Sequence, residues 1–153
     1  MSQAANGVHH VAWCVRPESI ERVRALWSAL GVTLDDLDLP DLGLHVMISW
    51  DAGVEIMSPI YDDGTLVASA RRFLDERGEG VYSVVFNVAS IDGAKAQVAA
   101  QGGKLVFEEH IPAEEVDERP LAGEGAPRFD IRQALYEDIC GMRICLQEMT
   151  PLP

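Results

Sequence analysis

The sequence predicts an α+β fold in which two tandem βαβββ modules form an incomplete barrel with a concave polar inner face. Three observations support this fold: a strand–helix unit occurs twice, three strand-like segments follow each helix, and polar residues recur on one face of the strands. We expect a single domain over residues 1–153, with module one at about 7–60, a linker at 61–78 and module two at about 79–149.

In module one, a strand at 7–15, "GVHHVAWCV", precedes a helix that starts near Ser19. Three strand candidates follow it, "VTLDDLDL", "LHVMISW" and "GVEIMSP", and the linker contains a short helical pattern, "ASARRFLDER". Module two repeats this order with a strand at 78–88, a helix that starts near Ser90, and the segments "KLVFEEH", "RFDIRQALYE" and "MRICLQE". Both serines suit helix N-caps.

The segment 108–128 is rich in acidic residues, Pro and Gly, and this composition predicts a long loop. The whole chain carries 25 acidic residues against 12 Lys and Arg, for a net charge of -13. Nucleic acids and anionic membranes need a basic face, so we expect neither as a partner. The sequence shows no secretory signal pattern, no apolar run of membrane-spanning length and no regular cysteine spacing, so we expect a cytoplasmic protein.

Alternation along the strands predicts which side chains share the polar face. On the first strand Val11, Trp13 and Val15 should pack against the helix, so the residues between them point the other way. The polar face then carries His10, Cys14, Glu55 and Met57 in module one, and Ser83, Asn87, Arg143, Cys145 and Gln147 in module two. A polar, concave face is a suitable place for a small-molecule ligand.

The order of these segments resembles the vicinal oxygen chelate superfamily, which includes glyoxalases, bleomycin-resistance proteins, extradiol dioxygenases and methylmalonyl-CoA epimerases. The resemblance covers residues 7–148, and "FLDERGEGVYSVVFNVASIDGAKAQVAAQGGKLVFEE" is similar to the epimerase branch. Many members of this superfamily pair as dimers, so the resemblance implies a homodimer.

Members of the superfamily typically bind one divalent metal ion through one ligand from each of four strands. The resemblance places these ligands at His10, Glu55, Ser83 and Cys145, where Ser83 and Cys145 replace the His and Glu of the family. Zinc sites usually have three or more protein ligands, so we expect no cofactor. The alternative is Zn, Co, Ni, Mn or Fe bound by His10 and Glu55, with Cys145 as a third ligand; the face of His45 is left open.

His10 and Glu55 would also form a general-base pair, in which Glu55 orients the imidazole and His10 moves the proton. Arg143 could stabilise a developing negative charge. These three catalytic candidates predict an enzyme of the isomerase or lyase type that abstracts a proton next to a carbonyl. Substrate contacts are expected from Cys14, Met57, Ser83, Asn87, Cys145 and Gln147. Two alternatives stay open: a non-catalytic protein that binds a small molecule, as bleomycin-resistance proteins do, and a methylmalonyl-CoA epimerase.

Overall fold

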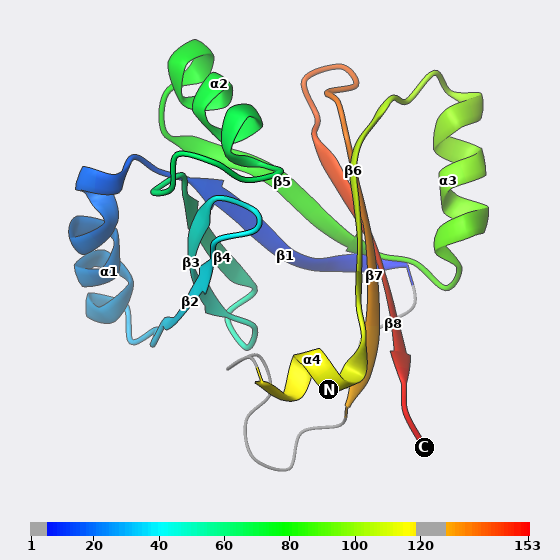
Figure 1. The fold of residues 1–153 in the computed structure, drawn as a ribbon, viewed down its shortest axis with the longest axis horizontal. Helices are drawn as coiled ribbons and strands as arrows, with labels where there is room; N and C mark the ends of the chain where they lie inside the picture. The colour runs from blue at the N-terminus through cyan, green and yellow to red at the C-terminus, as the bar shows by residue number, and fades with distance from the viewer. Residues whose placement is uncertain (1–5, 119–127) are drawn as a thin grey trace. The chain divides into compact units, whose positions relative to one another are not determined.

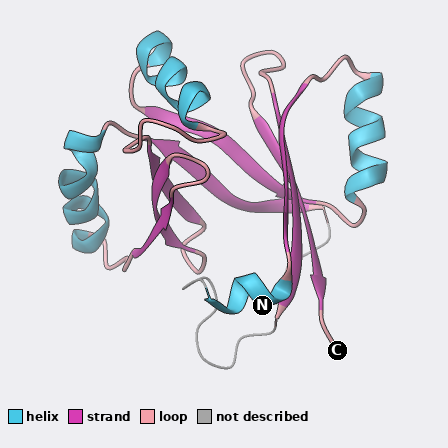
Figure 2. Ribbon diagram, in the orientation of Figure 1, coloured by secondary structure: helices cyan, strands magenta, loops and turns pink. Residues whose placement is uncertain are grey.

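The computed structural model describes residues 6–118 and 128–153, which form two compact units (Figure 1). The first unit spans residues 10–82, and the second comprises the described residues of 1–9 and 83–153. Each unit follows the strand–helix–three-strand order, so the predicted α+β class and the repeated βαβββ pattern are confirmed (Figure 2).

The first unit contains four strands in the order β2-β3-β4-β1. They are β1 (Gly7–Cys14), β2 (Asp35–Leu39), β3 (Leu44–Ser49) and β4 (Val54–Ser58). Strands β1 and β4 are parallel, whereas β2–β3 and β3–β4 are antiparallel. The helix α1 (Ile20–Ala29) packs on one face of these strands, where Trp13 and Trp27 lie against Met47 and Ile56 as the apolar pattern predicts.

A second helix in this unit, α2 (Val67–Arg77), matches the helical pattern of the linker. It buries four apolar side chains: Val67, Ala70, Phe73 and Leu74. The backbone carbonyls of α2 also receive donors from β1 and from the segment that follows it. The Arg16 guanidinium donates to Leu74 O at 3.0 Å, and the Cys14 thiol lies 4.0 Å from Ala70 O. These contacts attach α2 to the end of β1.

The second unit repeats the arrangement with the strand order β5-β8-β7-β6. Its strands are β5 (Gly80–Asn87), β6 (Leu105–Ile111), β7 (Phe129–Tyr136) and β8 (Ile144–Pro151). The parallel pair is now β5–β8, and the other two pairs are antiparallel. The helix α3 (Ile91–Ala100) packs on β7 and β8 through Ile91, Ala134, Tyr136 and Leu146 (Figure 1).

Two details differ from the sequence prediction. Residues 108–118 are not a loop, because β6 continues to Ile111 and a short helix, α4 (Ala113–Glu118), follows it. The rest of that predicted loop lies mostly outside the described residues. Ser19 also differs from Ser90: it ends a 3₁₀ turn (Pro17–Ser19) and makes no side-chain capping bond, whereas Ser90 Oγ accepts from Gly93 N at 3.2 Å.

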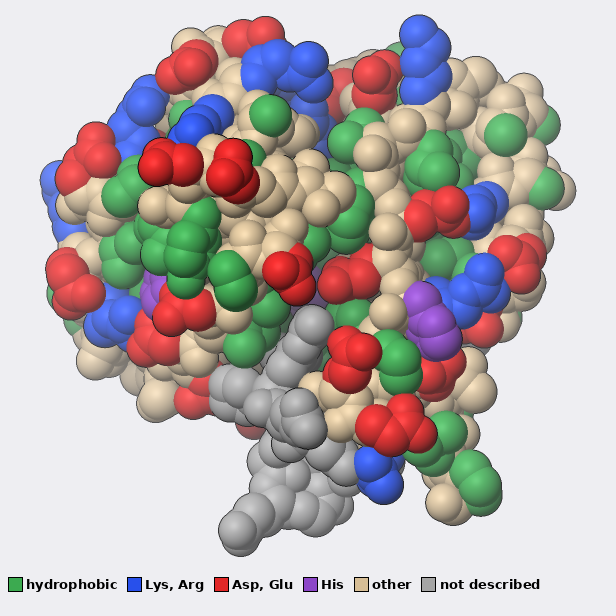
Figure 3. Space-filling model, viewed as in Figure 1, with side chains coloured by type: hydrophobic (Ala, Val, Ile, Leu, Met, Phe, Trp, Pro, Cys, Tyr) green, Lys and Arg blue, Asp and Glu red, His purple; other side chains and the backbone are tan. Residues whose placement is uncertain are grey.

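Acidic side chains are distributed over the face of the molecule shown in Figure 3, in keeping with the net charge of -13. The residues around them include Lys and Arg that form local ion pairs, such as Arg24 with Asp36 and Arg132 with Asp92. Within residues 6–118 and 128–153, no helix is both long and apolar enough to cross a bilayer.

Candidate functional site

The His10 and Glu55 side chains meet on the face of the first unit that points away from α1. Their strands run parallel, with Ala12 opposite Glu55, so His10 and Glu55 lie on the same side of the strand pair. His10 Nε2 and Glu55 Oε2 are 2.8 Å apart, a hydrogen-bond distance. His10 is 2% exposed, whereas 23% of the Glu55 side chain is exposed. The imidazole is therefore enclosed and the carboxylate reaches solvent.

The surroundings of this pair are mostly apolar. The register puts Ile48 opposite Glu55 and Val46 opposite Met57, so the same face continues onto β3 with aliphatic side chains. Val46, Ile48 and Met57 are all buried. Electrostatic interactions are stronger in such surroundings than in water, because the local dielectric constant is lower. The hydrogen bond between the imidazole and the carboxylate is correspondingly strengthened.

His45, whose face the sequence left open, lies on the opposite side of the strands. It alternates with Val46 and shares the side of Met47, which packs in the core against α1. Its two ring nitrogens contact Asp38 at 2.8 Å and Asp36 at 3.0 Å. His45 therefore belongs to the α1 side of the unit and does not join His10 and Glu55.

The second unit carries different residues at the positions equivalent to this pair. Ala12 lies opposite Glu55 in the first unit, and Val85 lies opposite Cys145 in the second. Cys145 therefore takes the place of Glu55, and Ser83, two residues before Val85, takes the place of His10. Both are buried, at 7% and 4% exposure. The register therefore shows that Ser83 and Cys145 are equivalent in position to His10 and Glu55, while their replacement of two family ligands stays an implication of the resemblance.

A chain of three carboxamides crosses the same face of the second unit. Gln133 Nε2 donates to Gln147 Oε1 at 2.6 Å, and Gln147 Nε2 donates to Asn87 Oδ1 at 3.0 Å. Gln147 has no exposed surface, so these bonds satisfy a polar group in the interior. Gln133 was not among the predicted site residues. Its position opposite Gln147 follows from the β7–β8 register, which the sequence does not reveal.

Arg143 precedes β8 and is held by a turn of its own unit. Its Nε donates to Asp138 Oδ1 at 2.9 Å, and both side chains are less than one-fifth exposed. The carbonyl of Arg143 accepts from Val84 N at 3.0 Å, which ties the start of β8 to β5. The guanidinium therefore has a fixed carboxylate partner in this structure.

The other predicted ligand contacts are enclosed. Cys14 and Met57 share the face of His10 and Glu55, but they are 0% and 3% exposed. Asn87 is 8% exposed. Of the nine predicted site residues, Glu55 and Arg143 are the two that are not buried. Their roles in catalysis and binding stay predictions.

The residues present do not complete the metal site that the resemblance implies. His10 and Glu55 offer an imidazole nitrogen and a carboxylate, but the equivalent positions of the second unit hold Ser83 and Cys145. Among residues 6–118 and 128–153, no group of three or more His, Cys, Asp or Glu side chains is arranged to hold a metal ion. Structural and catalytic zinc sites have three or four protein ligands, so this set does not fit the family's ion.

Comparison with known proteins supports the fold and the family. A hypothetical protein from Bacillus halodurans superposes with a TM-score of 0.66 at 19% identity, covering 98% of this chain and 99% of that one. A methylmalonyl-CoA epimerase from Mycobacterium tuberculosis gives a TM-score of 0.60 at 20% identity, over 100% of this chain and 94% of that one.

A variant of the Streptomyces coelicolor methylmalonyl-CoA epimerase, in complex with 2-nitronate-propionyl-CoA, gives a TM-score of 0.60 at 16% identity, over 95% of this chain and 98% of that one. No curated protein sequence matches significantly. The family model of the glyoxalase/bleomycin resistance protein/dioxygenase superfamily matches residues 9–120. The chain is therefore a member of the glyoxalase/bleomycin resistance protein/dioxygenase superfamily.

Proposed function

We propose that this protein is a small-molecule enzyme of the isomerase or lyase type, which abstracts a proton next to a carbonyl group with the His10–Glu55 pair. The observation that carries the proposal is the 2.8 Å hydrogen bond between an enclosed imidazole and a partly exposed carboxylate. Because the surrounding side chains are mostly apolar, the bond to His10 fixes the position of the carboxylate, and a fixed base favours proton transfer.

The exposure of the two groups assigns them different roles in this proposal. Glu55 is the proton acceptor, because its carboxylate is the group that a bound substrate could reach. His10 is a positioning residue, whose Nε2–H donates to Glu55 and fixes the direction of the carboxylate. The C–H bond breaks with its electron pair left on the substrate as an enolate, and the proton moves to a Glu55 oxygen. Return of the proton completes an isomerisation, whereas loss of a β-leaving group completes an elimination.

The enolate oxygen needs a hydrogen-bond donor or a positive charge. The sequence predicts charge stabilisation by Arg143 and substrate contacts from Ser83, Asn87 and Gln147, and these roles stay predictions. Arg143 keeps a permanent positive charge, but its bond to Asp138 restrains it and reduces its net charge effect.

The substrate class proposed is an acyl thioester with an acidic α-hydrogen. The support is the fold, which this chain shares with epimerases solved in complex with methylmalonyl-CoA or its nitronate analogue. A thioester carbonyl lowers the barrier for removal of an α-proton, and that is the step assigned to Glu55.

Hydrogen exchange at the α-carbon tests this function. The protein is incubated in D₂O with methylmalonyl-CoA and a series of other acyl-CoA thioesters, and deuterium uptake is followed by mass spectrometry. We expect uptake with at least one thioester, and a loss of about 100-fold or more in the Glu55→Gln variant, because general bases contribute on that order. Glu76→Gln, an exposed substitution on α2, serves as the matched control and should retain the wild-type rate. Wild-type exchange by Glu55→Gln would exclude the mechanism.

Two other functions have specific support. The family supports a binding protein whose ligand is sequestered without chemistry, because its description includes bleomycin resistance proteins. If calorimetry shows that a thioester binds, and the thioester is recovered from D₂O unchanged and without deuterium, the binding function is supported. The structural likeness to methylmalonyl-CoA epimerases favours an epimerase, which predicts epimerisation of methylmalonyl-CoA when Co²⁺ is added.

The homodimer and the cytoplasmic location also stay predictions. Sedimentation velocity would test whether the protein is a homodimer.

A further inference from the structure

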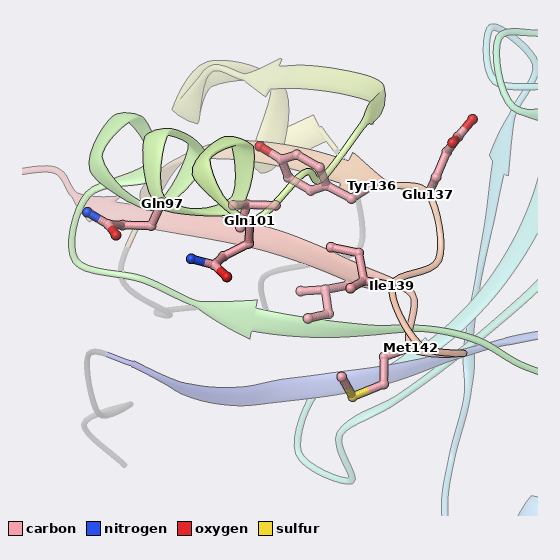
Figure 4. A pocket seen from close by; sticks show the side chains of 8 residues that line it. Gln97, Gln101, Tyr136, Glu137, Ile139 and Met142 are labelled. Carbon is pink, nitrogen blue, oxygen red and sulfur yellow. The ribbon is translucent and has the colours of Figure 1, made fainter.

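A cavity of about 250 Å³ lies in the second unit on the α3 side of its strands, the side opposite to Ser83 and Gln147. Its walls come from the last turns of α3, the end of β7 and the turn that leads into β8 (Figure 4). The apolar walls are Val98, Ile139, Met142 and Ile144, together with the Tyr136 ring. Nothing in the proposed function uses this cavity.

The walls are held by backbone hydrogen bonds rather than by side-chain packing alone. Ile139 and Met142 exchange two bonds, of 2.9 and 3.0 Å, which close the turn, and Gly103 N donates to Val98 O at 2.9 Å. Gly103 also lets the walls approach, since a Cβ there would lie 2.2 Å from Val98 Cγ1 and 3.4 Å from Ile139 Cδ1. These bonds fix the backbone positions of the walls, which lowers the ordering cost of binding.

The chemistry of the lining selects an uncharged ligand. Among the described residues that line the cavity there is no Lys, Arg or His, and Glu137, their one carboxylate, points away from the other side chains in Figure 4. Burial raises the pKa of Tyr136, so its phenol stays neutral. Gln101 extends from the side of α3 that faces Ile139 (Figure 4) and supplies a carboxamide at the rim.

We propose that this cavity binds a small uncharged aromatic molecule, with its ring beside Ile139, between Tyr136 and Met142, and one polar substituent at the Gln101 carboxamide. A cavity of roughly 150 Å³ holds benzene, so about 250 Å³ accommodates a ring with a short side chain. Aromatic rings pack favourably against other rings and against thioether sulfur. Met142 is 59% exposed and gives such a ligand a further apolar surface.

NMR titration of the full chain with 2-phenylethanol tests the site, with methyl resonances of Ile139 and Met142 as the readout. We expect saturable shifts at both methyl groups. Phenylacetate should bind more weakly, because its carboxylate meets no cationic side chain among the described lining residues and approaches a protein with a net charge of -13. Absence of saturable shifts, shifts confined to methyl groups elsewhere, or equal binding of phenylacetate would overturn the proposal.

Two variants localise the binding. Gln101→Leu, an exposed substitution, should weaken the binding of 2-phenylethanol by about threefold to tenfold. The affinity for toluene should not change, because only the alcohol uses the carboxamide. Val98→Phe should fill the cavity and abolish the shifts caused by both ligands. Loss of toluene binding in Gln101→Leu, or undiminished binding in a folded Val98→Phe, would contradict the assignment. If Val98→Phe does not fold, the alcohol–toluene comparison in Gln101→Leu decides the question alone.

Discussion

At the scale of single residues, the two units place different chemistry at equivalent positions. Gln147 lies opposite Asn87, whereas its counterpart Met57 lies opposite Cys14. The first unit therefore has an apolar pair where the second has two bonded carboxamides. A buried carboxamide is stable only while its partners remain, because an unmatched donor or acceptor keeps the cost of its lost hydration.

Replacing Gln147 by methionine, the residue type of its counterpart Met57, tests how far stability depends on the bonded carboxamides. We expect Gln147→Met to lower the free energy of unfolding by about 1–3 kcal/mol, because Gln133 Nε2 and Asn87 Oδ1 each lose this partner. Met57→Leu, a volume-conserving change at the equivalent site, should cost less than about 1.5 kcal/mol. Urea unfolding followed by circular dichroism measures both, and equal stability of Gln147→Met and wild type would refute the account.

At the scale of elements, a charged contact joins α1 to the strand β2. Arg24 donates to both carboxylate oxygens of Asp36, at 3.0 and 2.6 Å, and His45 on β3 contacts the same carboxylate. The Arg24 guanidinium holds the pKa of Asp36 below its ordinary value, against the opposing effect of partial burial. The acidic residues of β2 also discourage pairing with other strands, because β2 ends the strand order of its unit.

This contact predicts a pH-dependent term in stability. The pKa of Asp36 is lower in the folded state, so the contribution of this carboxylate to the free energy of unfolding is fully present above its pKa in the unfolded chain. The contribution is lost as pH falls through the Asp36 pKa of the folded state. The Asp36 side chain is half exposed, so solvent screening keeps the term below about 1 kcal/mol. The stability difference between wild type and Asp36→Asn should be constant at neutral pH and shrink in acid. A stability difference between the two proteins that grows on acidification would contradict the predicted direction of this pH dependence.

At the scale of the whole molecule, each unit has its own apolar core. Ile56 lies opposite Trp13 in the first core, and Leu146 lies opposite Phe86 in the second. The two residues are 2% and 5% exposed, so they are equivalent in position and similar in burial. We propose that both cores unfold together, as the predicted single domain over residues 1–153 requires.

The matched variants Ile56→Ala and Leu146→Ala test that proposal by differential scanning calorimetry. Each should lower the free energy of unfolding by about 2–5 kcal/mol, because each leaves a cavity in a packed core. If the chain is one cooperative domain, wild type shows a single transition and both variants shift it. Two transitions, of which each variant moves only one, would show that the units unfold independently.

Local features of the sequence were sufficient for the modules and for the face on which His10 and Glu55 lie, whereas their contact depends on the pairing of β1 with β4. Side chains alternate between the two faces of any strand. This alternation alone predicted that both residues point to the face away from α1. The repeat of strand and helix segments was likewise readable, since each element depends on its own apolar spacing.

Long-range register and packing decided the remaining features. The partner of Gln147 depends on how β7 aligns with β8, and the face of His45 depends on which side of β3 meets α1. The enclosure of Cys14 depends on a helix more than 50 positions later in the chain. The sequence by itself determined which residue types alternate on each strand, whereas only the tertiary structure decided their neighbours and their exposure, because those are set by contacts between segments distant in the chain.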